Sequence, residues 1–257
     1  EGQTLYEYHP DTKECSSWKF DRMVSTVVPE TDSTVIIALQ DEIVRVNLHD
    51  GHTTSIAPIP DENGKVRCND GKCDPAGHLW VGTMGFGAPK GAGTLYTVSP
   101  AGTVTTKLKK VTISNGIVWS SNKKFMYYND TPTGKIARYR YDADNRDILF
   151  DGIAVTLPAG TGAPDGMAID SDDHLWVAQW GGYGVYCYNP YTGELLAKVE
   201  VPAPNVASCA FGGKKMDTLY ITTARAGLSE EQLREYPLSG SVFCCKPGVK
   251  GVRANCF

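Results

Sequence analysis

A chain of 257 residues can form one large globular domain or two small ones, and a hydrophobic fraction of 41% is enough to build a core. The net charge of −4, with no basic run longer than 107–110, argues against nucleic-acid binding, and no apolar stretch reaches the ~20 residues that a membrane helix needs. Residues 1–6 do not resemble a signal peptide, so we expect a cytoplasmic protein with no nucleic-acid or membrane partner.

A repeated unit dominates the sequence, in which a short apolar or aromatic strand is followed by a turn and a second strand. In chain order the paired segments are 35–39 with 42–46, 79–83 with 93–98, 125–128 with 135–139, 175–178 with 184–188, and 219–222 with 240–244. The units begin at Val35, Leu79, Phe125, Leu175 and Leu219, which are 44, 46, 50 and 44 residues apart. Strands that repeat at this period are typical of the blades of a β-propeller.

The segment 2–11 resembles the second half of such a unit, and no first half precedes it. Five full units and one half predict an all-β fold, a six-bladed β-propeller whose first blade is incomplete at the N-terminus, and a single domain over 1–257. The only helix expected is short, around 229–234. The acidic segment 142–147 lacks the Gly and the distant Glu of a calcium loop, so we expect a hairpin turn there.

The eight cysteines form no Cys-x-x-Cys pair, and no histidine lies at zinc-finger spacing from them. Cys187, Cys244 and Cys245 fall inside hydrophobic strand patterns, where a free cysteine behaves as a small apolar residue. We therefore interpret the cysteines as buried reduced thiols of a cytosolic protein, with a disulfide in a secreted form as the alternative.

Small polar or thiol-bearing residues recur ten positions before the start of each unit, where the innermost strand of each blade should lie. They are Ser25, Asn69, Asn115, Asp165 and Cys209. Equivalent positions of propeller blades face one axis, so we expect these side chains to converge near one end of the channel. Buried polar groups cost about 1–3 kcal/mol when unsatisfied, and a cation with oxygen ligands or ordered waters would satisfy them. Asp70–Gly71, Asn115–Gly116 and Asp165–Gly166 are equally strong turn signals, so the spacing alone leaves a plain turn or wet channel open.

Several segments resemble the regucalcin/gluconolactonase family of sugar-lactone hydrolases, which includes senescence marker protein and luciferin-regenerating-enzyme-like members. In the family's order they are 67–77 with 79–84, 114–120, 164–170, 209–213 with 219–224, and 248–251. The resemblance extends from about Gly2 to Gly251. It implies a six-bladed propeller with one divalent metal at the channel mouth, which hydrolyses aldonolactones such as gluconolactone, and we expect a monomer.

The resemblance also implies roles for individual residues. Asn115 and Asp165 match family metal ligands, Asp165 is also the proposed general base, and Arg67 and Asn69 match residues that contact the sugar lactone. Such oxygen ligands suit Ca²⁺ first, with Zn²⁺, Mg²⁺ and Mn²⁺ as alternatives. The metal would polarise the lactone carbonyl while Asp165 takes a proton from the attacking water.

Two departures from the family pattern bear on the site. The family's third protein ligand, a Glu in an early Glu-Gly-Pro-type segment, has no counterpart in this sequence. The segment 85–87 stands where some members carry an acidic substrate contact, which leaves the sugar preference open.

Two other functional classes compete with the lactonase. One is a non-catalytic propeller that serves as a metal-binding or protein-interaction platform, and the other is a metal-free propeller enzyme resembling strictosidine synthase. Asn115 and Asp165 in register disfavour the latter, and the absence of a Gly-x-Ser-x-Gly segment disfavours a serine hydrolase. His78 and His174 occupy matching turn positions, where we expect solvated side chains.

Overall fold

The computed structural model of the chain describes residues 2–61 and 64–257, and nearly all of its regular structure is β-strand. The contacts divide the chain into two compact units. The first unit runs to Ile113 and also includes Ala254–Phe257, and the second is Ser114–Arg253. Among the described residues, no helix is long and apolar enough to cross a membrane.

The first unit contains one two-stranded and two four-stranded antiparallel sheets, each built from consecutive strands. The two-stranded sheet pairs β1 (Thr4–Tyr8) with β2 (Cys15–Lys19). The next sheet is β3 (Val24–Pro29), β4 (Thr34–Leu39), β5 (Glu42–Asn47) and β6 (Thr53–Pro58). The last is β7 (Val66–Cys73), β8 (Leu79–Gly85), β9 (Gly93–Val98) and β10 (Val104–Val111).

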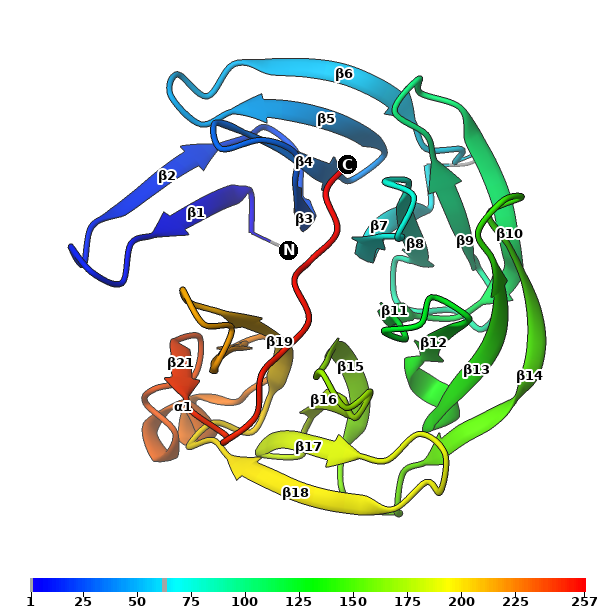
Figure 1. Cartoon of the computed structure of the whole chain (residues 1–257). Helices are drawn as coiled ribbons and strands as arrows, with labels where there is room; N and C mark the ends of the chain where they lie inside the picture. The colour runs from blue at the N-terminus through cyan, green and yellow to red at the C-terminus, as the bar shows by residue number, and fades with distance from the viewer. Residues whose placement is uncertain (1, 62–63) are drawn as a thin grey trace. The chain divides into compact units, whose positions relative to one another are not determined.

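The second unit contains two four-stranded sheets and one three-stranded sheet (Figure 1). The first is β11 (Ser114–Trp119), β12 (Phe125–Asp130), β13 (Lys135–Asp142) and β14 (Asp147–Thr156), with a short 3₁₀ turn η1 (Thr131–Thr133) after β12. The second is β15 (Ala163–Ile169), β16 (Leu175–Trp180), β17 (Gly184–Tyr188) and β18 (Leu195–Glu200). The third is β19 (Val206–Gly212), β20 (Thr218–Thr223) and β21 (Val242–Cys245).

Antiparallel sheets of consecutive strands are the blades of a β-propeller, so the predicted all-β propeller fold is confirmed. The blade count is wrong, because the described residues form five blades rather than six. β1 and β2 form only a hairpin. The hairpin packs Leu5 and Trp18 against Ile37 and Val44 of the following sheet, so it covers a blade without making one.

The apolar runs that define the repeat are the second strands of the blades. β8 is buried along almost its whole length, and Leu175–Ala178 of β16 are also buried. A strand covered on both faces shows a continuous apolar run instead of alternation, which explains why these segments stand out in the sequence. The last strands of the same blades, such as β18, are largely exposed.

The two local predictions outside the repeat are confirmed. The helix α1 (Glu230–Glu235) begins after Ser229, whose side chain accepts from the N–H of Gln232 in a capping box. Asp142 stands at the hairpin between β13 and β14, where its carboxylate accepts from the N–H groups of Asp144 and Asn145. These hydrogen bonds and one from the Asn145 side chain lower the pKa of Asp142.

All eight cysteines are free thiols. Cys68, Cys73, Cys187 and Cys209 are buried, and burial raises the pKa of Cys68 and of Cys187 to about 12. The prediction of a buried thiol is thus confirmed for Cys187 and wrong for Cys244, which lies exposed on β21, and also wrong for the exposed Cys15 and Cys256.

Candidate functional site

The Asn-Gly and Asp-Gly pairs lie inside strands. The first strands of three blades, β7, β11 and β15, carry a β-bulge at these pairs. The pairing shifts between Asn115 and Ile117 in β11, and between Pro164 and Met167 in β15. None of the three glycines has the positive φ of a hairpin turn. The turn interpretation is therefore wrong, and the bulges re-aim the polar side chains beside them.

The glycines of these bulges allow neighbouring blades to approach closely. A Cβ added to Gly116 would lie 2.4 Å from Nδ2 of Asn129 and 2.5 Å from the carbonyl oxygen of Asp165. A Cβ added to Gly166 would lie 2.3 Å from Oγ of Ser208. Each glycine is required because the next first strand lies where a side chain would otherwise be.

Asn115 offers its carbonyl oxygen to the side away from Thr131. Its Nδ2 donates to Oγ1 of Thr131 at 3.0 Å, and that hydroxyl donates to the carbonyl oxygen of Pro164 at 2.8 Å. A carbonyl can only accept, so the hydroxyl proton of Thr131 is used there and the hydroxyl must accept from Asn115. The amide nitrogen of Asn115 therefore faces Thr131, and its Oδ1 points to the other side.

Asp165 lies on β15, the first strand of the blade that packs against β11. The carbonyl oxygen of Asp165 accepts from Nδ2 of Asn129 at 2.9 Å, and Asn129 is fully buried on β12 opposite Asn115. The structure thus brings Asn115 and Asp165 together on neighbouring strands. A carboxylate and an oriented amide oxygen are hard oxygen donors of the kind that Ca²⁺ and Mg²⁺ prefer.

Two buried oxygens on the strands that pair with β11 and β15 have no hydrogen-bond partner among the described residues, Oδ1 of Asn129 and Oε1 of Gln179. Asn129 is the cross-strand partner of Asn115, and Gln179 is the partner of Pro164 beside Asp165. Buried acceptors without partners call for water or an ion. The residues around Asn115 and Asp165 therefore fit a divalent cation with oxygen ligands.

Arg67 and Asn69 lie on β7 in the first unit. Nη1 of Arg67 donates to Oδ1 of Asn69 at 2.9 Å and to the carbonyl oxygen of Cys68 at 3.0 Å. A guanidinium only donates, so the atom of Asn69 that faces it must be the oxygen. The amide nitrogen of Asn69 lies on the other side, which suits contact with a ligand oxygen better than with a cation.

Asp70 is a candidate that the sequence analysis treated only as a turn residue. It is half-buried in the β7 bulge, where its Oδ1 accepts from the N–H of Gly71 at 2.8 Å. Burial raises the pKa of Asp70, against the opposing effects of the Lys72 ammonium and the Gly71 N–H. The available signal was a second polar residue directly after Asn69, followed by Gly71.

Ser25 and Cys209, the remaining members of the predicted ring, differ in their position relative to the bulge of their strand. Ser25 lies at a bulge of β3 and donates to the carbonyl oxygen of Ala38 at 3.1 Å. In β19 the bulge falls between Val206 and Ser208, so Cys209 lies beyond it, and its thiol donates to the carbonyl oxygen of Trp176 within the core. The ten-residue offset therefore fails in this blade, because the bulge comes earlier in its first strand. The convergence of Asn69 with Asn115 and Asp165 stays a prediction.

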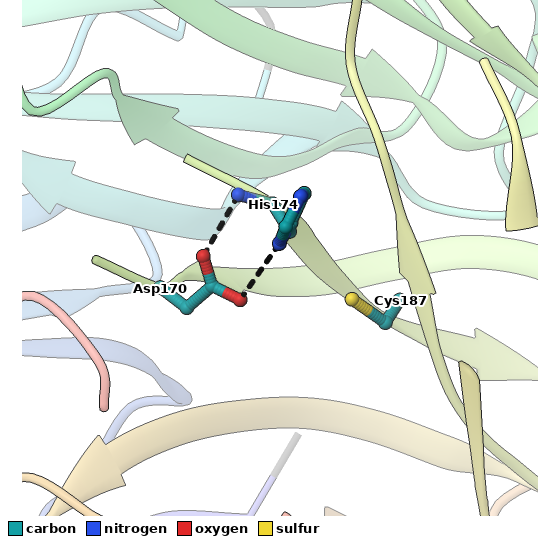
Figure 2. A group of neighbouring side chains, drawn as sticks. All are labelled: Asp170, His174 and Cys187. Carbon is teal, nitrogen blue, oxygen red and sulfur yellow. Dashed lines mark hydrogen bonds and ion pairs between the residues drawn. The ribbon is translucent and has the colours of Figure 1, made fainter. Parts of the chain in front are cut away.

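Asp170, His174 and Cys187 form a second group of possible ligands, shown in Figure 2. Their ligand atoms all lie within 4.8 Å of one another. The Asp170 carboxylate accepts from the N–H groups of Asp172 and His174 through Oδ1, and from Nε1 of Trp176 at 2.9 Å through Oδ2. Nδ1 of His174 lies 3.4 Å from Oδ2 of Asp170.

The same turn occurs in the first unit without a cysteine. Asp74 accepts from the N–H groups of Ala76 and His78 and from Nε1 of Trp80, also at 2.9 Å. Thr97 pairs with Trp80 as Cys187 pairs with Trp176. The repeated arrangement ties a buried tryptophan to the turn before its strand, so we assign the group around Asp170 to the fold. His78 and His174 lie in these turns as predicted, and both are half-buried, so the side chains are only partly exposed to solvent.

Comparisons with known proteins agree with this architecture. Residues 1–225 match the family described as SMP-30/Gluconolactonase/LRE-like region. The chain is 34% identical over 242 residues to "Putative sugar lactone lactonase YvrE" of Bacillus subtilis (strain 168), covering 94% of this chain and 83% of that protein. It is 33% identical over 254 residues to regucalcin of Danio rerio, covering 98% and 86%.

A solved structure is similar over nearly the whole chain. A calcium-binding protein, regucalcin from Agrobacterium tumefaciens str. C58, has a TM-score of 0.94 at 29% identity and covers 99% of this chain and 86% of its own. The chain belongs to the SMP-30/gluconolactonase/LRE-like family.

Proposed function

We propose that the protein hydrolyses sugar lactones, aldonolactones such as gluconolactone, with one divalent cation held by Asn115 and Asp165. Membership of the gluconolactonase-like family supports the reaction class. The observation that carries the site is the orientation of the Asn115 amide, whose oxygen is turned away from Thr131 beside the strand that bears Asp165. Ca²⁺ is the first choice because the donors are hard oxygens, and Zn²⁺, Mg²⁺ and Mn²⁺ remain to be compared.

Each of the candidate site residues has a separate role in the proposed hydrolysis. When bound, the cation supplies Lewis acidity at the lactone carbonyl. Asp165 takes a proton from the attacking water and returns it to the ring oxygen as the C–O bond breaks, so the product is the open hydroxy acid. Asn69 and Arg67 would contact the sugar lactone, because Arg67 binds the oxygen of Asn69 and thereby turns the amide nitrogen of Asn69, a donor, to the other side.

Acid release from gluconolactone tests the proposal. We expect hydrolysis that a chelator removes and added Ca²⁺ restores, and Asp165→Asn should lower the rate by about 10²–10⁴-fold because it removes the base with little change in shape. Asp172→Asn is the matched control, since Asp172 is an exposed carboxylate in the turn that follows β15. No metal-restorable activity on a panel of aldonolactones would contradict the proposal.

A non-catalytic platform is the second candidate, and one surface feature favours it. Leu149, Phe150 and Ile153 of β14 are 67%, 58% and 48% exposed, although apolar side chains grouped on one strand are more often covered. An inactive protein that still binds Ca²⁺ would support this candidate. We expect a monomer in solution, and light scattering would show whether β14 instead joins two copies.

A further inference from the structure

We propose that Asn129 and Thr131 form a clamp that positions the two candidate cation ligands of this chain. Thr131 fixes the amide of Asn115, and the two clamp residues together hold the backbone of β15 at Pro164 and Asp165. The role of the ligands rests on the proposed function, whereas the clamp itself rests on hydrogen bonds within the second unit.

Thr131 is held in place by the turn that it begins. It is the first residue of η1, with Pro132 after it and Gly134 closing the turn at a positive φ of 62°. The hydroxyl of Thr133 donates to the carbonyl oxygen of Asp130 at 2.7 Å, which ties the turn to the end of β12. The hydroxyl of Thr131 therefore stays between Asn115 and Pro164 without depending on a flexible loop.

Asn129 acts on the other ligand through the backbone. It has no exposed surface, and its Nδ2 donates to the carbonyl oxygen of Asp165. Thr131 binds the preceding carbonyl, that of Pro164, so two consecutive peptide carbonyls of β15 are bound by side chains of the neighbouring blade. Because Gly116 has no Cβ, Asn129 can lie this close to Asp165. The clamp thereby fixes where the Asp165 side chain leaves the strand.

The clamp predicts a specific defect when the Thr131 hydroxyl is removed. In Thr131→Val nothing distinguishes the two ends of the Asn115 amide, so the amide can turn its nitrogen toward the site, and a nitrogen that carries two protons cannot bind a cation. We expect the dissociation constant for Ca²⁺ to rise roughly 3- to 10-fold, the size of a lost hydrogen bond. Thr131→Ser keeps the hydroxyl and should bind like the parent protein.

Two measurements test the clamp. Calorimetric titration with Ca²⁺ compares the parent protein, Thr131→Val and Thr131→Ser. In ¹⁵N spectra, the side-chain NH₂ signals of Asn115, identified by their loss in Asn115→Asp, should shift and exchange faster with water in Thr131→Val and return in Thr131→Ser. Thr131→Ala, at a half-exposed position, replaces Thr131→Val if circular dichroism shows that the valine variant does not fold.

A failure of the proposed function can be distinguished from a failure of the clamp. If the parent protein binds neither Ca²⁺ nor the other divalent ions, the proposed function is contradicted, and the Asn115 spectra alone decide the clamp. Unchanged Asn115 signals in both the valine and the alanine variants overturn the clamp. An unchanged dissociation constant in a variant whose Asn115 signals have moved overturns its role in cation binding.

Discussion

At the scale of single residues, Asn69 and Asn115 carry the same side-chain amide, but their neighbours bind opposite ends of it. Arg67 binds the oxygen of Asn69, whereas Thr131 accepts from the nitrogen of Asn115. The neighbours therefore decide that one amide offers a donor and the other an acceptor. A donor suits a substrate oxygen and an acceptor suits a cation, which matches the roles expected for these residues.

Replacing Gly116 by Ala should destabilise the protein by about 1–3 kcal/mol, because the new Cβ would overlap Nδ2 of Asn129 and the Asp165 carbonyl. Urea unfolding measures the loss. Gly2→Ala is the control, since nothing lies within 4 Å of that position and its φ is not positive. Equal stabilities of the two variants would mean that the blades can separate at this point without cost.

The sequence could predict which residues of β11 and β15 are polar, but not what binds them. Asn115 and Asp165 are identifiable from the repeat and the resemblance. Thr131 and Asn129 are not, because their contacts lie in the next blade and depend on how two sheets pack. The one available signal is that Asn129 is a polar residue directly after the apolar run of β12, where a buried polar side chain must find a partner.

At the scale of elements, the turn before each of the strands β8 and β16 is organised by one carboxylate. Asp74 and Asp170 each accept hydrogen bonds from two backbone N–H groups and one indole N–H. Both residues are fully buried. The Asp74 turn has Thr97 where the Asp170 turn has Cys187, yet the two turns are built in the same way. The repetition is what assigns both to the fold.

Replacing Asp170 by Ala should cost about 2–4 kcal/mol, because two backbone N–H groups and the buried indole N–H of Trp176 lose their acceptor, and Asp74→Ala should cost a similar amount. Cys187→Ala should cost only about 1 kcal/mol, since it removes a small apolar group from the core. Thermal or urea unfolding of the three variants measures these differences. A zinc-dependent stabilisation of the parent protein that Cys187→Ala abolishes would instead make the group around Asp170 a metal site.

The stability of the sheet β3–β6 should depend on pH through Glu30. Arg45 holds the pKa of Glu30 below its ordinary value of 4.5 by hydrogen bonding, so the contribution is present above that value and is lost as the pH falls through the lowered pKa. Glu30→Gln should lose about 1 kcal/mol at neutral pH, since Arg45 is partly exposed and solvent weakens the pair. Urea unfolding at neutral and acidic pH should show the two proteins converging in acid. A constant difference would place the effect elsewhere.

At the scale of the whole molecule, the repeat period predicted the fold class but overcounted the blades. The second strands of the blades are visible in the sequence because both of their faces are covered. The hairpin β1–β2 resembles part of a blade in sequence, yet strand pairing depends on partners that a local pattern does not specify. The earlier bulge in β19 escaped detection for the same reason, since counting residues assumes that every blade has the same register.

Thiol labelling should sort the cysteines by burial. We expect Cys15, Cys244 and Cys256 to react in the native protein, Cys245 to react more slowly, and the four buried cysteines to react only in denaturant. Burial also raises the pKa of the Cys68, Cys73 and Cys187 thiols, which keeps them protonated. Mass spectrometry counts the labels, and Cys15→Ser should lower the fast count by one. Rapid labelling of Cys209 would contradict its position in the core.

The bulges at Asn115–Gly116 and Asp165–Gly166 also affect how fast these two residues are converted to isoaspartate. In a flexible chain, the glycine nitrogen of such a pair attacks the preceding side-chain carbon and closes a cyclic imide, with loss of ammonia from Asn or of water from Asp. Water then opens the imide to aspartate or isoaspartate. In β11 and β15 both glycines are buried in extended backbone against the next blade, so the attack requires the strand to open first. Peptide mapping after long incubation should find isoaspartate at these positions in denaturant and not in the native protein. The chemical lifetime of the two candidate ligands is then set by how often their blades open.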